Sequence, residues 1–293
     1  LINELMDFRK VESGALEVKV MPGNIGLFLR ELADEFSELA IQKNIRFDVQ
    51  IPEGLPTAWF DRQVLEKIVL NLVSNSFKYT SDGGQITLEI MTSLDGFKPS
   101  FGNELLLPGN YKPVESLYIR VADNGIGISK ESIRHLFERY YKISESHLGS
   151  GIGLAFVKSL TQLHKGGIKV YSERSEGTEI IIAIPVGEAD YAAAEQWEQN
   201  HEEAGVRLES IHYKYEQQLP AVDRDATTIQ QTAVIPPVTH SDQQSPPADS
   251  NGQKPVILLV EDSDELRNFL KDNLQQQYTI AEAANGQEAL DYL

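Results

Sequence analysis

Two asparagines and a lysine stand at helical spacing in the segment that follows Asp61. Asn71 and Asn75 are four residues apart and Lys78 comes three residues later, so on a helix the three side chains lie on one face. An amide oxygen is a hard ligand of the kind that Mg²⁺ accepts, and an ammonium group pairs with phosphate oxygens. The pattern is suited to a hydrated cation and phosphates, and a solvated helix face is the alternative interpretation.

A carboxylate followed by two glycines ends a strand-like run at residues 121–128, VADNGIGI. Asp123 is placed to accept a hydrogen bond from an exocyclic amine. Gly125 and Gly127 permit a positive φ or a close approach of the backbone. A plain turn is the alternative, because Asp-Asn-Gly is common in turns.

Three alternating glycines lead into an amphipathic helix pattern at residues 147–160, HLGSGIGLAFVKSL. Gly149, Gly151 and Gly153 leave backbone N–H groups open at a helix start, which favours an anion such as phosphate. The spacing is neither that of a Walker P-loop nor that of a Rossmann dinucleotide site. A flexible loop with a glycine hinge is the alternative.

The stretch between the two glycine runs has the composition of a lid. A short helix capped by Ser129 is expected first, and a polar stretch follows it. Aromatic anchors, Phe137, Tyr140 and Tyr141, stand near its hinge. Arg139 among them is a cation that can meet phosphates.

The elements that must position these residues alternate between helical and strand patterns before residue 187. Asn24 and Asp61 are expected to cap helices, the first with apolar positions as far as Leu39. Residues 93–115 contain Gly, Pro and Asn and are expected to form a long hairpin loop. The other expected elements are a helix over 1–13 and strands over 45–51, 85–92, 116–122, 167–173 and 178–184.

The composition is that of a soluble globular chain of about two domains. The chain has 293 residues, 41% hydrophobic and 24% charged, and its net charge is −18. That charge disfavours nucleic acid and anionic membranes as partners. The absence of cysteine excludes disulfides and thiol chemistry, and neither a membrane span nor a signal peptide is expected. Since the chain starts at Leu1 and stops in a helical pattern at Leu293, we expect a longer parent protein.

The acidic residues concentrate in the stretch 187–253. Its last part, Pro236 to Gln253, is rich in Pro, Ser, Gln and Gly and is expected to be extended and mobile. Residues 189–217 are compatible with a surface helix. Residues 254–293 are expected to form strand, helix, strand and part of a helix. A piece of about 40 residues rarely folds alone, so we expect 251–293 to be poorly ordered or to lean on a neighbour.

Five segments resemble, in this order, the N, G1, F, G2 and G3 boxes of bacterial sensor histidine kinases: NLVSNSFKYT, DNGIGI, LFERYYK, GSGIGLAFVK and SEGTEIIIAIP. These boxes form the ATP-binding domain of the superfamily shared with gyrase and MutL. LINELMDFRKVESG resembles the end of the second helix of the dimerisation and phosphoacceptor hairpin. VILLVEDSDELRNFL, residues 256–270, resembles the opening of a response-regulator receiver. The order is similar to that of a hybrid two-component histidine kinase.

The resemblance implies an α/β (α+β) two-layer sandwich, a mixed sheet with helices on one face, followed by a partial flavodoxin-like receiver. The implied domains are the end of a dimerisation helix over 1–14, the ATP-binding catalytic domain over 15–186, an acidic flexible linker over 187–253 and a truncated receiver over 254–293.

The resemblance also implies roles for single residues. Asn71, Lys78 and Arg139 would be catalytic, with Arg139 at the γ-phosphate. Asn75 would ligate Mg²⁺, and Asp123 would bond the adenine amine. The expected ATP-binding set is Asn71, Asn75, Lys78, Tyr79, Asp123, Gly125, Gly127, Tyr140, Gly149, Gly151, Gly153, Leu154 and Thr178, and Glu261 and Asp262 match the magnesium-binding acidic pair of receivers.

Asn71 stands where members that hydrolyse ATP with water tend to have a glutamate as general base. An asparagine cannot take a proton, so the resemblance implies a site that holds ATP and Mg²⁺ for another nucleophile, a histidine. That histidine would precede residue 1, and the phosphorylated receiver aspartate would follow residue 293. His201 has the start of the acceptor motif without its proline, and His135, His147 and His164 are expected at the surface or core edge.

Two alternatives remain from the residues: an ATP-hydrolysing relative, and a non-catalytic nucleotide-sensing scaffold. The implied partners are ATP, the phosphoacceptor hairpin of the parent chain or of a dimer partner, and a receiver domain, with a homodimeric parent. No direct nucleic acid binding is expected. The parent would be cytoplasmic, or anchored in the inner membrane with this part facing the cytoplasm.

Overall fold

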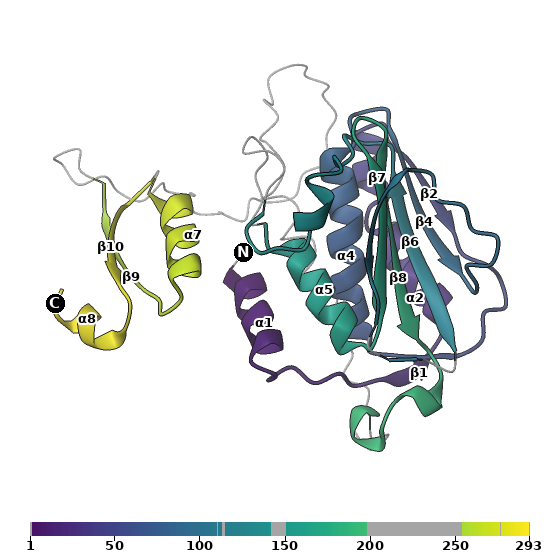
Figure 1. The fold of residues 1–293 in the computed structure, drawn as a ribbon, viewed down its shortest axis with the longest axis horizontal. Coiled ribbons are helices and arrows are strands. Elements are labelled where there is room, and N and C mark those ends of the chain that lie inside the picture. Colours follow the sequence, from purple (N-terminus) through teal and green to yellow (C-terminus); the bar gives the residue numbers. More distant parts are fainter. Residues whose placement is uncertain are drawn as a thin grey trace, which may run out of the picture. The chain divides into compact units, whose positions relative to one another are not determined.

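The computed structural model describes residues 2–109, 111–112, 115–141, 151–197, 254–275 and 277–292. The chain divides into two compact units, Leu1–Leu219 and Pro220–Leu293. Figure 1 labels their helices and strands. Each unit is described by itself.

The first unit alternates helices and strands around one large sheet. In chain order its elements are α1 (Ile2–Glu12), β1 (Met21–Gly23), α2 (Ile25–Asp34), α3 (Ser37–Gln42), β2 (Arg46–Gln50), β3 (Ala58–Phe60), α4 (Arg62–Tyr79), β4 (Gln85–Met91), β5 (Asn103–Leu107), β6 (Ser116–Asp123), a 3₁₀ turn (Ile133–His135), α5 (Gly153–Leu163), β7 (Gly167–Glu173), β8 (Gly177–Pro185) and two further 3₁₀ turns (Glu188–Asp190 and Ala193–Glu195).

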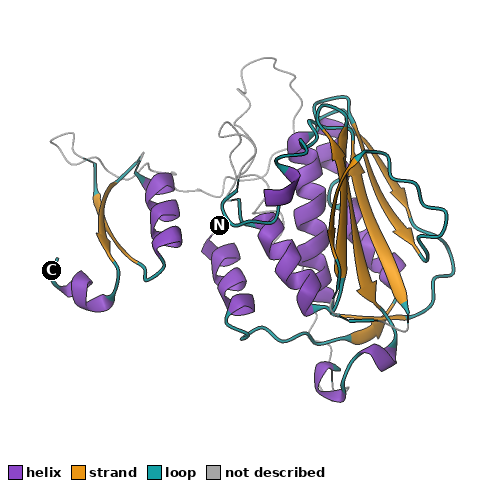
Figure 2. Ribbon diagram, in the orientation of Figure 1, coloured by secondary structure: helices purple, strands orange, loops and turns teal. Residues whose placement is uncertain are grey.

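Six strands form a mixed sheet in the order β2-β4-β6-β8-β7-β5. β2 and β4 run parallel, and the other neighbours run antiparallel. Helices α2, α4 and α5 cover one face of this sheet (Figures 1 and 2). The expected mixed sheet with helices on one face is therefore confirmed.

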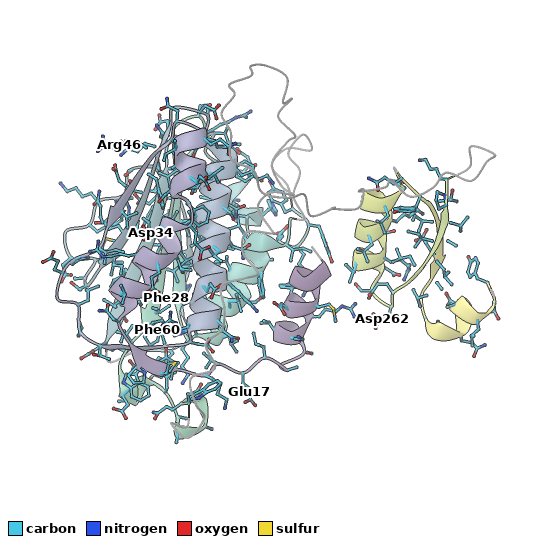
Figure 3. The ribbon with its side chains drawn as sticks, turned by 180° about the vertical axis from the view of Figure 1, so that it is seen from behind. Glu17, Phe28, Asp34, Arg46, Phe60 and Asp262 are labelled. Carbon is cyan, nitrogen blue, oxygen red and sulfur yellow. The ribbon has the colours of Figure 1, made fainter. Side chains whose placement is uncertain are left out.

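Alternation along the strands explains which face the helices cover. In β6, Leu117, Ile119 and Val121 are buried, whereas the residues between them are partly exposed. Period-2 burial of this kind is the mark of a sheet with one covered face. Figure 3 labels Phe28 of α2 and Phe60 of β3, whose ring centroids lie 5.3 Å apart in this core.

The two expected helix caps are confirmed. The Asn24 side-chain oxygen accepts the Leu27 N–H at 2.9 Å and starts α2. The Asp61 carboxylate accepts the N–H groups of Gln63 and Val64 at 3.0 and 3.1 Å and starts α4. Each cap satisfies donors that the first helical turn leaves without partners.

The helix that begins at Asn24 does not continue to Leu39, as the apolar pattern predicts. α2 ends at Asp34 and α3 begins at Ser37. Phe36 lies at the break, 3% exposed, with its ring stacked on that of Phe77 at 5.4 Å between centroids. Burial of this ring, which helical periodicity does not encode, accompanies the break.

The loop expected over 93–115 contains a strand, so that expectation was wrong in part. β5 pairs antiparallel with β7 at the edge of the sheet, from Asn103 opposite Ser172 to Leu107 opposite Ile168. The sequence NELLL has no β-branched residue, and leucine and glutamate are not strong strand formers. Pairing with β7 compensates for this weak local preference.

The linker expected from residue 187 does not begin there. Residues 188–197 fold back onto the segment between α1 and β1: Val20 N–H donates to the Glu195 carbonyl at 2.8 Å, and Trp197 N–H donates to the Val20 carbonyl at 2.9 Å. Lys165 Nζ lies 2.6 Å from the Glu195 carboxylate. We call residues 188–197 the strap. Charge composition cannot distinguish such a segment from a solvated linker.

His164, expected at the surface or core edge, is fully buried beneath the strap. Its Nε2 accepts the Asp61 N–H at 3.1 Å, and its Nδ1 lies 2.8 Å from the Tyr191 hydroxyl. That hydroxyl donates its one proton to the Pro185 carbonyl at 2.8 Å, so Nδ1 must donate to it. The imidazole is therefore neutral, with the proton on Nδ1 and both nitrogens hydrogen-bonded.

The second unit contains β9 (Val256–Val260), α7 (Asp264–Leu274), β10 (Thr279–Ala283) and α8 (Gly286–Leu290). β9 and β10 pair in parallel, from Thr279 opposite Val256 to Ala283 opposite Val260. Parallel neighbours need a crossover connection, which α7 supplies. The described residues thus show the expected strand, helix, strand and helix order.

Candidate functional site

Two helices bring the first and third predicted motifs together. Asn71 lies on α4, where its Nδ2 donates to the Lys67 carbonyl at 2.8 Å. Gly153 begins α5, and a Cβ built on it would lie 2.8 Å from Asn71 Oδ1. Because that distance is shorter than real Cβ contacts, only glycine fits here without a shift. The start of α5 and the amide of Asn71 therefore lie in direct contact.

The other polar residues of α4 follow toward its C-terminal end. Asn75 and Lys78 are partly buried, and Lys78 Nζ lies 5.0 Å from the ring centroid of Tyr79. Burial raises the pKa of the Tyr79 hydroxyl. This half-buried end of α4 offers amide oxygens and an ammonium group at one place.

Asp123 stands at the end of β6, beside α4. Its Oδ2 accepts the Ser76 hydroxyl at 2.9 Å, and its Oδ1 accepts the Gly125 N–H at 3.0 Å. Burial raises the pKa of the carboxyl to about 6, although hydrogen bonds from Gly125, Ser76 and the Thr178 backbone oppose that rise. The carboxylate is fixed in direction and ready to accept one further donor.

The glycine loop, residues 124–128, is pressed between α4 and the hairpin of β7 and β8. A Cβ on Gly125 would lie 2.5 Å from the Tyr79 carbonyl oxygen, and one on Gly127, at φ +59°, would lie 1.8 Å from the Glu173 carbonyl oxygen. Neither position can hold a side chain. Close backbone approach, and not a plain turn, therefore describes this motif.

The β7–β8 hairpin forms the far wall of the glycine loop through hydroxyl groups. Ser172 Oγ accepts the Ile128 N–H at 2.8 Å and donates to the Gly177 carbonyl at 2.7 Å. The Thr178 hydroxyl lies 2.9 Å from Ser172 Oγ, and Ser175 N–H donates to the Ile126 carbonyl at 2.7 Å. Thr178 is thus joined to the loop that carries Asp123.

Sequence reasoning missed Ser76 and Ser172. Both are small polar residues within a helix or strand, which is an ordinary place for serine. Their importance is visible only once β6 is paired with β8 and packed on α4. Ser76 is 5% and Ser172 0% exposed, and each donates a hydrogen bond within the site.

The lid residues are only partly described. Tyr140 N–H donates to the Gly151 carbonyl at 3.0 Å, and both residues have positive φ, +60° and +68°. Leu154 follows Gly153 and is partly buried. Gly149 lies outside the described residues.

Arg139, for which a contact with the γ-phosphate is expected, lies over an aromatic ring of α1 in this structure. Its guanidinium carbon is 5.4 Å from the centroid of Phe8. Phe8 in turn packs edge-on against Phe156 of α5 at 6.1 Å. The cation is exposed and lies at the junction of α1, the lid and α5.

The acidic pair of the second unit stands after β9. Glu261 Oε1 accepts the Ser263 N–H at 3.0 Å, and Asp262, labelled in Figure 3, is exposed. Within the described ranges, no group of three or more His, Asp or Glu side chains is arranged to hold a metal ion. The pair alone does not complete a metal site there.

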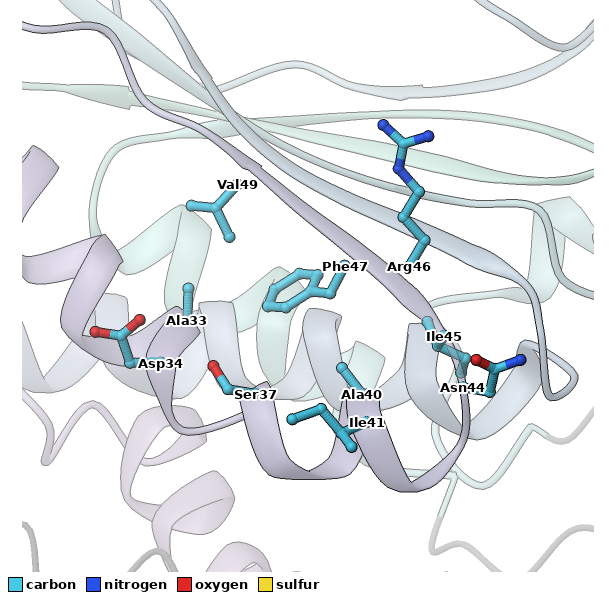
Figure 4. Close-up of a pocket in the computed structure, with 10 residues that line it drawn as sticks. All are labelled: Ala33, Asp34, Ser37, Ala40, Ile41, Asn44, Ile45, Arg46, Phe47 and Val49. Atoms are coloured by element: carbon cyan, nitrogen blue, oxygen red, sulfur yellow. The ribbon is translucent and has the colours of Figure 1, made fainter.

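A pocket of about 560 Å³ lies apart from these residues, between α2, α3 and the edge strand β2 (Figure 4). None of the predicted site residues lines it. Phe47, Ile45 and Ala40 give it apolar walls, and Asp34 and Arg46 stand at its rim. It is an open groove at the sheet edge, separate from the site around Asn71 and Asp123.

A family model described as "Histidine kinase-, DNA gyrase B-, and HSP90-like ATPase" matches residues 60–188. These residues are therefore similar to the ATPase domains that histidine kinases share with DNA gyrase B and HSP90. The range begins at the last residue of β3, just before α4, and ends at the first residue of the strap, so it contains the site residues described above in the first unit. Glu261 and Asp262 lie outside it.

Two relatives of the chain are named as histidine kinases. Histidine kinase P4 of Formosa agariphila is 31% identical over 99% of the chain, and sensor histidine kinase TmoS of Ectopseudomonas mendocina is 26% identical over 100% of it. The chain spans 19% and 26% of their lengths. The crystal structure of full-length ShkA in complex with AMPPNP has a TM-score of 0.52 at 19% identity, covering 99% of this chain and 46% of that one, a likeness of fold.

Among the residues that the structure describes, none of the helices has the length and apolar composition needed to cross a bilayer.

Proposed function

We propose that this chain is the ATP-binding catalytic part of a sensor histidine kinase of the hybrid type. The observation that carries the proposal is the fixed carboxylate of Asp123, held by Ser76 and Gly125 beside the polar face of α4. A carboxylate aimed in this way selects a donor such as the exocyclic amine of adenine. The kinase names of the relatives support the same assignment.

The chemistry of the site fits a nucleoside triphosphate. Gly125, Gly127 and Gly153 lie where a Cβ would collide with the surrounding backbone or with Asn71, so they let the glycine loop and the start of α5 pack closely beside Asp123 and Asn71. Phosphate oxygens would meet Lys78 and the start of α5, where N–H groups and the helix dipole favour negative charge.

The donor set also fits a hydrated Mg²⁺. Asn75 would hold it through the amide oxygen, with Asn71 contacting its water shell, because magnesium keeps several waters and takes few protein ligands. Bound there, Mg²⁺ would neutralise charge on the phosphates during transfer. The residues of this chain would position the nucleotide, and Asn71 would supply no base for water.

Phosphoryl transfer depends mainly on positioning and charge stabilisation. The nucleophile would be a histidine on the phosphoacceptor hairpin of the parent protein, whose imidazole attacks the γ-phosphorus while the bond to the β–γ bridging oxygen of ATP breaks. Asn71 cannot remove a proton from water, so hydrolysis should be slow. A receiver aspartate would then accept the phosphoryl group from the histidine.

The second unit supports the hybrid part of the proposal. A parallel β-α-β unit with Glu261 and Asp262 at the end of its first strand has the arrangement expected at the start of a receiver. Partners would then be the hairpin and a completed receiver, within a homodimeric parent.

Calorimetric titration of the 293-residue chain with Mg·ATP tests the proposal. We expect magnesium-dependent binding that Asn75→Ala and Asp123→Ala each weaken, whereas Asp95→Ala, which removes an exposed carboxylate, leaves it unchanged. Steady-state release of ADP is measured in parallel. Absence of binding would favour a scaffold without nucleotide, and rapid ADP release would favour an ATP-hydrolysing enzyme.

A further inference from the structure

The segment that leads into β5 contacts the β7–β8 hairpin at three successive points, the last of them at the first residue of β5. Ser100 Oγ donates to the Glu179 carboxylate at 3.1 Å, and Asn103 Nδ2 donates to the Glu173 carboxylate at 3.1 Å. Between them, Phe101 lies against Gly177. We call residues 100–103 the buttress. It belongs to the stretch that the sequence pattern assigned to a loop.

Phe101 fills the space beside the turn into β8. A Cβ built on Gly177, at φ +143°, would lie 2.8 Å from Phe101 Cζ and 2.0 Å from the Asp123 carbonyl oxygen. The ring and the end of β6 therefore enclose Gly177 closely. Since Thr178 follows directly, the ring fixes the residue whose backbone N–H supports the Asp123 carboxylate.

The hairpin is in turn hydrogen-bonded to the glycine loop, so the position of the hairpin fixes that of the loop. Ser175 N–H donates to the Ile126 carbonyl at 2.7 Å, and Ile128 N–H donates to Ser172 Oγ at 2.8 Å. A Cβ on Gly127 would lie 1.8 Å from the Glu173 carbonyl oxygen. With contacts this close, a small displacement of the hairpin must displace the loop and the donors around Asp123.

A buried ion pair holds the buttress in place. Glu179 is 0% exposed, and its Oε2 accepts Arg120 Nη2 at 2.6 Å together with the Ser100 hydroxyl. The other oxygen, Oε1, is buried without a hydrogen-bond partner among the described residues, so the carboxylate is held through Oε2, where Arg120 and Ser100 meet. Ser100 therefore has a fixed place on β8, and this fixes the neighbouring Phe101.

We propose that Phe101 and Asn103 are positioning residues for base recognition: they hold the β7–β8 hairpin against the glycine loop and so set how well the Asp123 site distinguishes adenine from other bases. The proposal rests on the proposed function, since it concerns the same nucleotide site. It adds a segment that the boxes resembling histidine kinases do not include.

The test compares two nucleotides on the full 293-residue chain by calorimetry: Mg·ATP, and the purine riboside triphosphate that lacks the 6-amino group. A hydrogen bond to a charged acceptor predicts that the wild type binds ATP about tenfold or more tightly than the analogue. For Phe101→Ala and Asn103→Ala we expect ATP binding to weaken about tenfold and analogue binding to change little, so that discrimination falls. Phe101→Leu, which retains most of the side-chain volume, should retain most of the discrimination between the two nucleotides.

Phe97→Ala is the matched control. Phe97 lies in the same stretch and packs on Tyr171 of β7 at 6.2 Å between ring centroids, so its loss lowers stability without touching Gly177. It should retain the discrimination ratio. If Phe101→Ala does not fold, Asn103→Ala decides, because its ATP binding should weaken about tenfold while its analogue binding changes little.

The outcomes separate the two proposals. A wild type that binds neither nucleotide overturns the proposed function and this inference with it. This inference alone is overturned if the wild type discriminates and the Phe101 and Asn103 variants keep its ratio of ATP affinity to analogue affinity. It is also overturned if the Phe97 variant loses that ratio to the same extent.

Discussion

At the scale of single residues, Asp123 is the group whose chemistry is most constrained. Two donors fix its oxygens and burial raises its pKa to about 6. It accepts a donor from a ligand only when ionised. Protonation below pH 6 should therefore compete with base recognition.

The pH dependence of nucleotide binding follows because only the ionised Asp123 carboxylate accepts a donor from the ligand. Affinity for Mg·ATP should be nearly constant above pH 7 and about tenfold lower at pH 5, where most of the Asp123 carboxyl is protonated. Titration calorimetry from pH 5 to pH 8 measures it. Because ATP itself also titrates, Asp123→Asn is the reference: it should bind weakly and lack the added loss. Equal pH profiles for both proteins would contradict the role of Asp123.

His164 makes stability, not binding, depend on pH. Burial lowers its pKa to about 4 from 6.5, so between these values the unfolded chain binds a proton that the folded chain does not. The free energy of unfolding should be highest above pH 6.5 and fall by about 3 kcal/mol on going to pH 4. Urea denaturation at several pH values measures it. His164→Gln retains a donor and an acceptor without titrating, and should lose less on acidification.

The placement of site residues was predictable where chemistry and local spacing coincide. Asn71, Asp123 and the glycines of both runs could be chosen from type and spacing, and the structure brings Asn71 to Gly153 and Asp123 to the glycine loop. Ser76 and Phe101 could not be chosen. Their partners are far away in the sequence, and serine and phenylalanine at such positions have many ordinary explanations.

At the scale of elements, the contact between α4 and α5 sets the geometry of the part of the site that is proposed to hold the phosphates. Asn71 and Gly153 meet where a methyl group would come within 2.8 Å of the amide oxygen. The two helices therefore hold the polar face of α4 against the start of α5.

Gly153→Ala tests this contact. The added methyl should displace Asn71 or the first turn of α5 and weaken Mg·ATP binding about tenfold, whereas stability changes little because alanine favours a helix. Gly286→Ala is the matched control, because Gly286 also begins a helix and has no atom within 4 Å of its Cβ position. Unchanged ATP affinity in Gly153→Ala would show that the site tolerates the shift.

Local signals predicted the elements that local interactions define. Asn24 and Asp61 cap helices as expected, because a cap needs only its own first turn. β5 escaped prediction, since its pairing with β7 joins residues 103 and 172. The break at Phe36 has the same origin: a ring buried against Phe77 decided where α2 ends.

At the scale of the whole chain, the strap closes the first unit. Tyr191 is 4% exposed, and Glu195 pairs with Lys165 at 2.6 Å. The ordered part of this unit therefore extends beyond residue 186, where the sequence pattern placed the end of the catalytic domain.

Truncation tests this boundary. A chain ending at Trp197 should retain the stability of the first unit in the full chain. One ending at Gly187 should lose about 3 kcal/mol or more, from the burial of Tyr191 and its hydrogen bonds to His164 and Pro185. Urea denaturation followed by circular dichroism compares the three. Equal stability of the two short chains would place the strap outside the cooperative unit.

The hydrogen bonds between Val20 and residues 195 and 197 have a consequence for how such proteins are assembled. The segment that leads into β1 and the strap that follows β8 lie side by side at this point. A module with adjacent entry and departure points can be transplanted between hosts through one joint without disturbing its interior. Chimeras spliced before α1 and after Trp197 should therefore keep the core intact, because Phe8 and Val18 are buried in it, whereas splices inside residues 188–195 should damage it.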